Sequence, residues 1–278
     1  MGPALKTLDA SYRAHAIPLG SVRHWSWLFA ASPARAPLLG VYALLAEWNA
    51  LTDPGTEASA SRIKLAWWRE EIQRLIGRAP IHPICRYLAA LPRAADVDFT
   101  PLSHAIDASL AELSGVPLER SAELEAHAWA LRAAPLGLAS RLAFAGVNEA
   151  ALGDCLRALA VADYLARATR DYRRQARLGR VPFVVEELLA AGLDNADLCA
   201  DQPPAGLEVY LAQLQARATR SYETALLALP EACRPRQRHL LVLAALGLKH
   251  SQRRASGLES TRVRDMLLAW STARRALR

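Results

Sequence analysis

Residues 167–180 of this chain read RATRDYRRQARLGR, and six of them are arginine. The segment is typical of a helix, in which Arg167, Asp171 and Gln175, spaced four residues apart, stack along one face. A helix that binds metal ions and diphosphate would carry two or three carboxylates on that face, whereas this one has Asp171 alone. The segment is therefore either a catalytic helix whose ligands have been replaced or a basic helix surface.

The rest of the chain also has a helical composition. Of its 278 residues 52% are hydrophobic and only 14 are glycine, and apolar residues recur every three or four positions, as in SRIKLAWWREEIQRLI at 61–76. No repeat or low-complexity linker divides the chain. We therefore predict an all-α helical bundle, formed as a single domain by residues 1–278 with a core over about 18–275.

Helix boundaries follow from the apolar spacing and from Gly and Pro. Residues 26–52 should form two helices that break near Pro33, and a third should have Ser59 or Ser61 as its N-cap and end at Gly77. Further helices are expected over residues 82–91, 119–144 with a kink at Pro135 and Gly137, 149–176, 207–228, 236–254 and 258–276, with a loop over 194–206.

Several classes of protein are excluded by simple patterns. The longest strongly apolar run, residues 240–248, is too short to cross a bilayer, and the N-terminal segment lacks the apolar region of a signal peptide. We therefore expect a cytoplasmic protein. The cysteines are widely scattered and are expected to be small buried hydrophobes rather than zinc ligands; they are Cys85, Cys155, Cys199 and Cys233.

Positive charge is concentrated at the C-terminal end. Residues 234–278 hold eleven Arg or Lys against Glu259 and Asp265, a net charge of +9, while the whole chain carries +7. Such a region could contact anionic lipid, nucleic acid or an acidic partner. The alternative is ordinary surface arginine, because the basic residues are interleaved with a core pattern. No nucleic-acid-binding motif is present, so we expect no nucleic-acid partner.

Four segments, read in order, carry a family resemblance: residues 20–53, 62–91, 160–181 and 186–193. Their order and spacing resemble the squalene/phytoene synthase family, which consists of all-α enzymes that join two prenyl diphosphates head to head. The resemblance covers about residues 18–275 and implies an isoprenoid-synthase-type bundle with a central cavity. The segment around Pro135 and Gly137 would flank that cavity.

The first acidic motif of the family is incomplete in this chain. In the family it follows a Tyr-Ala-Phe/Leu segment, matched here from Tyr42, and has the form Asp-Asp/Glu-x-x-Asp. The corresponding residues are Asn49, Ala50 and Asp53, so one carboxylate is retained. An arginine that the family often places just before the motif aligns with Ala46.

The second acidic motif is also incomplete. The family form is Asn/Asp-x-x-Arg-Asp-x-x-Glu-Asp, followed by Gly-Arg-x-Tyr. The corresponding residues are Arg167, Arg170, Asp171, Arg174 and Gln175, then Gly179 and Arg180. Pro182 takes the position of the expected tyrosine, and Asp171 is the acid that matches the motif.

These losses bear on the Mg²⁺ chemistry that the resemblance implies. Magnesium needs hard oxygen ligands, usually including carboxylates. Asp53 and Asp171 are weak candidates, Asn49 and Gln175 are neutral amides, and Arg167 would repel a cation by roughly 4 kcal/mol per unit charge at about 4 Å. We therefore predict no metal site, with Mg²⁺ as a cofactor only if the chain is an active enzyme.

We predict a degenerate member that has lost prenyl transfer. YALLAEWNAL and LARATRDY resemble the branch that includes the mitochondrial complex I assembly factor with a phytoene-synthase-like domain. That resemblance implies an assembly, scaffold or isoprenoid-binding role. The implied partners are a prenyl diphosphate or isoprenoid lipid and a respiratory-complex assembly partner, and the implied location is peripheral to the inner face of a membrane.

Two alternatives stay open. In the first, the chain is an active prenyl transferase whose arginines bind diphosphate directly. The arginines concerned are Arg167, Arg170, Arg174 and Arg180. In the second, a stripe of arginines formed by Arg170, Arg173, Arg174 and Arg177 faces solvent, which is expected above all for the last three. Arg167 with Asp171, or Asp171 with Arg174, would then form ordinary helix-surface pairs.

Overall fold

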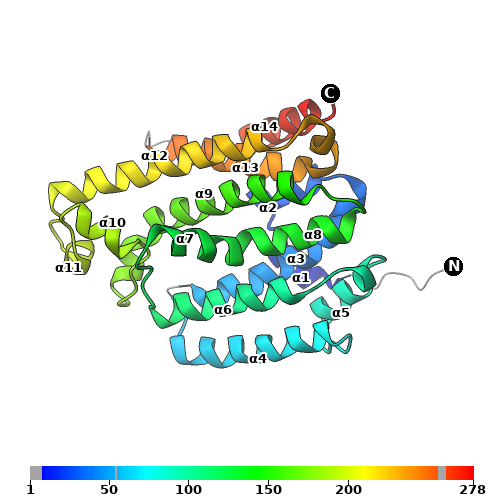
Figure 1. The fold of residues 1–278 in the computed structure, drawn as a ribbon, viewed down its shortest axis with the longest axis horizontal. Coiled ribbons are helices and arrows are strands. Elements are labelled where there is room, and N and C mark those ends of the chain that lie inside the picture. The colour runs from blue at the N-terminus through cyan, green and yellow to red at the C-terminus, as the bar shows by residue number, and fades with distance from the viewer. Residues whose placement is uncertain (1–7, 54, 256–260) are drawn as a thin grey trace.

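The computed structural model in Figure 1 describes residues 8–53, 55–255 and 261–278. Over these ranges the chain is helical and contains no strand, with a single bridge between Leu118 and Val184. The all-α prediction is therefore confirmed. The helices are α1 (Ala10–Ala16), α2 (Val22–Leu28), α3 (Ser32–Thr52), α4 (Ala58–Ile76), α5 (Pro83–Ala89), α6 (Thr100–Ser114), α7 (Ser121–Ala128), α8 (Ala134–Ala143), α9 (Glu149–Ala176), α10 (Val185–Ala190), α11 (Asn195–Cys199), α12 (Ala205–Ala228), α13 (Arg234–Ala255) and α14 (Arg262–Arg275).

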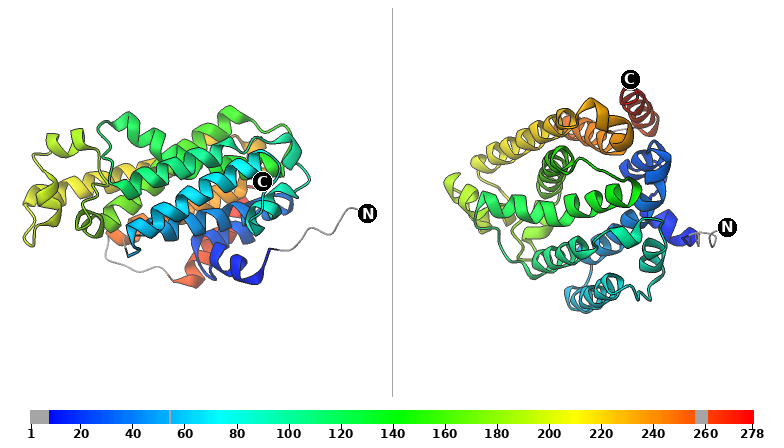
Figure 2. Two further views of the ribbon diagram at one scale, coloured as in Figure 1. Left: turned by 90° about the horizontal axis from the view of Figure 1, so that it is seen from below. Right: turned by 45° about the vertical axis from the view of Figure 1, so that its right-hand side comes forward.

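The long helices α3 and α9 hold the centre of the bundle. α9 packs along α12 on one side and against α7 and α8 on the other, while α3 packs against α8, α6 and α4 (Figures 1 and 2). The Asn148 side chain caps α9 by accepting a hydrogen bond from the Ala151 N–H at 3.1 Å. The observed ends of α9 agree with the predicted range of 149–176.

A π-helical segment, Trp129–Ala133, joins α7 to α8. Pro135 lies just after it and has no N–H to donate to the carbonyl of Leu131, so a regular α-helical ladder cannot continue there. The predicted distortion near Pro135 is therefore confirmed. Its effect is to present Arg132 and Leu136 toward the interior of the bundle, where both line a cavity.

Other boundary predictions need correction. The N-cap of α4 is Glu57, and Ser61 is fully buried within the helix instead of capping it. The predicted loop over 194–206 contains α11, which begins with a capping box between Asp194 and Asp197. α6 was not expected at all. The last predicted helix is observed as α14, and residues 258–260 of that prediction lie outside the described residues.

Two predictions about burial and membrane insertion can also be compared with the structure. Cys85 and Cys155 are buried as expected, but Cys199 is exposed and Cys233 is only partly buried, so the expectation for these two was wrong. Cys199 ends the short helix α11, whose buried residue is Leu198.

Within the described ranges, no helix combines the length and the apolar character needed to cross a membrane.

Candidate functional site

The two incomplete motifs lie on α3 and α9, which face each other across a cavity of about 360 Å³. Asn49 lines this cavity from α3, and Arg167 and Arg170 line it from α9. Residues from α2, α8, α12 and α13 complete the wall. The structure thus brings parts of both motifs to one cavity, as the resemblance implied.

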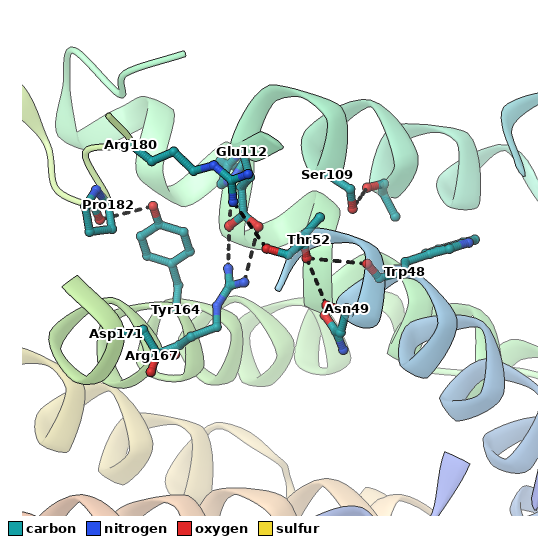
Figure 3. A network of polar contacts seen from close by, with 12 residues as sticks. Trp48, Asn49, Thr52, Ser109, Glu112, Tyr164, Arg167, Asp171, Arg180 and Pro182 are labelled. Atoms are coloured by element: carbon teal, nitrogen blue, oxygen red, sulfur yellow. Dashed lines mark hydrogen bonds and ion pairs between the residues drawn. The ribbon is translucent and has the colours of Figure 1, made fainter. Parts of the chain in front are cut away.

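Arg167 does not pair with Asp171 but with Glu112 of α6 (Figure 3). Both terminal guanidinium nitrogens of Arg167 donate to the Glu112 carboxylate, Nη1 to Oε2 at 3.2 Å and Nη2 to Oε1. His127 Nε2 lies 3.4 Å from Oε1. Burial alone would raise the pKa of Glu112, but the charge of Arg167 and the hydrogen bonds outweigh it and lower the pKa to about 2. The ion pair links α9 to α6.

The two retained carboxylates are each paired with an arginine. Asp171 accepts hydrogen bonds from Arg170 at 2.9 and 2.6 Å, and Asp53 accepts one from Arg174 at 3.1 Å. The predicted pairs of Asp171 with Arg167 and with Arg174 are therefore wrong, because each arginine reaches a different carboxylate. Among the residues that the structure describes, no cluster of three or more His, Cys, Asp or Glu side chains could hold a metal ion.

A smaller pocket of about 80 Å³ lies on the other side of Arg167. Gln175 and Asp171 line it from α9, and the buried Arg180 closes it by donating to the Thr52 carbonyl at 3.4 Å (Figure 3). Burial lowers the pKa of Arg180. Arg180 thus ties the segment after α9 to the end of α3, which is a structural contact between the two motif helices.

The larger cavity is lined by several ionisable residues that sequence reasoning did not single out. Arg23, Arg132 and Arg254 add to Arg167 and Arg170, while Asp163 accepts a hydrogen bond from the Tyr222 hydroxyl at 2.7 Å. Apolar side chains cover much of the remaining wall; they are Val22, Leu45, Leu136, Ala166 and Leu243. A cavity with cationic and apolar surfaces suits a ligand with an anionic group and a hydrocarbon part.

Two cationic side chains of this cavity, Arg23 and Arg132, are poorly compensated. Burial, together with the nearby charge of Arg167, lowers the pKa of Arg132 to about 10, and burial lowers the pKa of Arg23. Within the described ranges, Arg132 makes no hydrogen bond or ion pair, and Arg23 donates only to the Tyr42 carbonyl at 3.4 Å. Burial raises the pKa of Asp163, the acid in the wall.

The remaining predicted site residues have different environments. Tyr42 lines the larger cavity from α3 and is buried, and its hydroxyl lies 2.8 Å from Ser26 Oγ in a hydrogen bond that joins α3 to α2. Ala50 is exposed, and its carbonyl accepts from Thr56. Arg173, Arg174 and Arg177 are exposed, as the solvent-facing alternative expected for them.

Some of the missed residues could have been found from spacing. Asp163 lies four residues before Arg167 and therefore continues the same face of α9. Arg132 lies in the segment that was expected to flank the cavity. Glu112 had no comparable signal, because it lies on α6, a helix that was not predicted.

Comparison with known proteins agrees with the fold. The sequence model of the squalene/phytoene synthase family matches residues 20–255. The chain belongs to the squalene/phytoene synthase family. A search of curated protein sequences gave no match.

Solved structures of this family have the same fold. A dehydrosqualene synthase in complex with ligand superposes with a TM-score of 0.68 at 14% identity, covering 94% of this chain and 96% of that one. Squalene synthase HpnC from Alicyclobacillus acidocaldarius superposes with a TM-score of 0.69 at 18% identity, covering 93% of this chain and 100% of that one. At these identities the likeness concerns the fold alone.

Proposed function

We propose that this squalene/phytoene synthase homologue binds a prenyl diphosphate or a related anionic isoprenoid without Mg²⁺ and does not carry out prenyl transfer. The observation that carries the proposal is the ion pair between Arg167 and Glu112. It fixes a cation on the face of α9 where the family motif has a neutral or acidic residue.

The donor set is poorly suited to Mg²⁺. Asp53 and Asp171 are both paired with arginines, and the side chain of Ala50 cannot bind a metal. A divalent ion between these groups would compete with an arginine at each carboxylate and would approach Arg167, at a cost of roughly 4 kcal/mol per unit of charge at about 4 Å. The proposed function therefore includes no step that uses a metal ion.

Guanidinium groups can replace the metal for binding. Arginine donates paired hydrogen bonds to phosphate oxygens and stays charged when partly buried. Arg23 and Arg132 have unused donors in the cavity, and the apolar part of the wall suits a prenyl chain. The cavity volume of about 360 Å³ lies within the range of about 300–1,000 Å³ that is typical of ligand pockets.

The test is to mix the purified protein with farnesyl or geranylgeranyl diphosphate, in Mg²⁺ or in EDTA. Calorimetry should detect binding of similar affinity in both buffers, and an assay for released diphosphate should detect none. Arg132→Met should weaken binding at least tenfold, since it removes one charged hydrogen-bond donor. Arg177→Met, which changes an exposed arginine outside the cavity, is the matched control.

An active enzyme would behave differently. Release of diphosphate that requires Mg²⁺ and is abolished by Asp171→Ala would support the prenyl transferase alternative and overturn the proposal. Absence of binding in both buffers, with a respiratory-complex protein copurifying, would instead support an assembly or scaffold role without an isoprenoid ligand.

A further inference from the structure

The C-terminal helix α14 carries one set of buried apolar residues and one set of exposed apolar residues. Its inner face, which includes Ala269 and Ala273, packs with Trp25, Val242 and Leu246 in a small core formed with α2 and α13. Its outer face carries a second row of apolar residues, which we call the outer stripe. The outer stripe consists of Val263, Met266, Leu267, Trp270 and Leu277.

The outer stripe is open to solvent. Val263 lies three and four residues before Met266 and Leu267, Trp270 lies four and three residues after them, and Leu277 follows Trp270 by seven, so these residues lie along one side of the helix and its C-terminal extension. Val263 is 63% exposed, Leu267 54% and Trp270 48%. In the right-hand view of Figure 2, α14 stands at the outer edge of the molecule beside the C-terminus. Such a row of large apolar side chains marks an interaction surface.

Positive charge surrounds the outer stripe. The exposed arginines of this segment are Arg262, Arg264, Arg274, Arg275 and Arg278. The acid of α14, Asp265, is buried and lies 2.9 Å from His250 of α13, so its charge is turned away from the stripe. The Arg274 guanidinium lies 5.3 Å from the centre of the Trp270 ring. Trp and Arg side by side are typical of the boundary between hydrocarbon and lipid headgroups.

A groove of about 380 Å³ runs between α12, α13 and α14. Its wall is largely apolar, with Leu227 and Leu268 among the lining residues, and also includes the cations Arg234, Lys249 and Arg275. The groove therefore combines apolar surface with positive charge, as the outer stripe does.

We propose that the outer stripe of α14 docks on the surface of an anionic lipid bilayer, with its apolar side chains in the interface and its arginines among the headgroups. The charge favours this occupant over a second copy of the chain. A symmetric dimer would place the same patch against itself, arginines facing arginines. A negatively charged membrane attracts each of these side chains. The docking does not depend on the ligand of the central cavity.

The test is flotation of the purified full chain with vesicles of phosphatidylcholine alone or with about one third phosphatidylglycerol. The protein should float with the anionic vesicles and remain behind with the neutral ones. The fraction bound should fall as salt is raised, because headgroup attraction is screened. Arg264→Gln with Arg274→Gln should weaken binding about 25-fold, at about fivefold for each arginine near the surface.

A second variant tests the apolar part. Leu267→Gln with Trp270→Gln should reduce vesicle binding at least tenfold, while the matched change of two exposed apolar residues elsewhere, Ile63→Gln with Leu189→Gln, should have no effect. Circular dichroism and the melting temperature should be unchanged in all variants, since the substituted side chains are exposed. Equal binding to neutral and anionic vesicles, or none to either, would overturn the proposal. A wild-type dimer that Leu267→Gln with Trp270→Gln converts to monomer would assign the stripe to a second copy.

Discussion

Removing one partner of an ion pair that is mostly shielded from water costs far more stability than removing one partner of an exposed pair, and this chain has both kinds of pair. The Glu112 carboxylate is 19% exposed and Arg167 is its partner. Glu112→Gln should lower the free energy of unfolding at pH 7 by about 3 kcal/mol, because Arg167 is left without its counter-charge. Urea denaturation of the two proteins measures the difference.

The same pair predicts a pH dependence with a definite sign. The pKa of Glu112 falls from its ordinary value of 4.5 to about 2 in the folded chain. Its stabilising contribution is therefore complete above about pH 4.5 and is lost as the pH falls toward 2. The difference between wild type and Glu112→Gln should shrink over that window. As a control, Asp53→Asn removes an exposed pair with Arg174 and should cost less than about 1 kcal/mol at any pH. If the difference in free energy of unfolding between wild type and Glu112→Gln stays constant from pH 7 to 3, the lowered pKa of Glu112 is not the source of its contribution.

Arg132 illustrates the reverse case, a cation without a partner. In the absence of ligand, Arg132→Met should raise the free energy of unfolding by about 1–2 kcal/mol, because a charge that is costly to keep in the cavity is replaced by an apolar chain. Arg177→Met, at an exposed site, should change it by less than about 0.5 kcal/mol. Thermal denaturation without ligand measures both. A loss of stability in Arg132→Met would mean that Arg132 is a structural residue.

At the scale of single residues, the sequence predicted which side chains are exposed better than it predicted which side chains form ion pairs. The exposure of Arg173, Arg174 and Arg177 follows from their stripe on α9 and was expected. The partner of Arg167 could not be found, because Glu112 lies 55 residues earlier on a helix that was not predicted. Contacts between distant segments depend on how helices pack, and helical spacing gives only the face of each helix.

At the scale of elements, the crossing of α12 and α13 depends on Gly247. A Cβ atom at this position would lie 2.5 Å from Cζ and 2.8 Å from the hydroxyl oxygen of Tyr222. The Tyr222 side chain is buried, and its hydroxyl donates a hydrogen bond to Asp163. Gly247→Ala should therefore destabilise the protein by about 1–3 kcal/mol, as overpacking does. It should also weaken ligand binding, since Gly247 and Tyr222 both line the cavity.

A second glycine on a helix provides the control. A Cβ atom added at Gly153 of α9 would meet no neighbouring atom within 4 Å, so Gly153→Ala should stabilise the helix by up to about 1 kcal/mol. Chemical denaturation should show a lower free energy of unfolding for Gly247→Ala and a higher one for Gly153→Ala than for the wild type. Equal effects at the two sites would show that helix propensity, and not contact with Tyr222, governs Gly247.

Helix prediction succeeded where the local signal was strong. The 28 residues of α9 have an Asn cap, a continuous apolar face and a glycine soon after the end, and their bounds were predicted within a residue. α6 was missed although its buried Leu102, Ile106 and Leu113 lie at helical spacing, four and seven residues apart, because small and polar residues between them weaken the pattern; these are Ser103, Ala105, Ala108 and Ser109. α11 was missed because five residues are too few to show helical spacing.

At the scale of the whole molecule, the family fold persists although the acidic motifs are incomplete. The bundle is held largely by apolar packing spread over most helices; Tyr42 belongs to this core, and the other motif positions do not. Fold and chemistry can therefore change separately, which is why the resemblance predicted the fold and the central cavity but could not establish the function.

Because α3 and α9 face each other across the cavity, substitutions on these two helices should be able to restore a Mg²⁺ site. Adding carboxylates alone, by Asn49→Asp with Gln175→Asp, should not produce Mg²⁺ binding while Arg167 is present, because repulsion of roughly 4 kcal/mol per unit charge corresponds to about a thousandfold loss of affinity. The triple variant that also carries Arg167→Asn should bind Mg²⁺, and isothermal calorimetry of both variants measures the difference in affinity.

Glu112 has to be controlled in this experiment, since removal of Arg167 leaves its carboxylate free to bind a cation. Repeating the triple variant with Glu112→Gln separates the two sources of affinity. If binding persists without Glu112, the ligands come from α3 and α9, and these helices are close enough to share an ion. If the variant that retains Arg167 binds Mg²⁺ as tightly as the triple variant, Arg167 does not govern metal binding, and the physical basis for a metal-free function is lost.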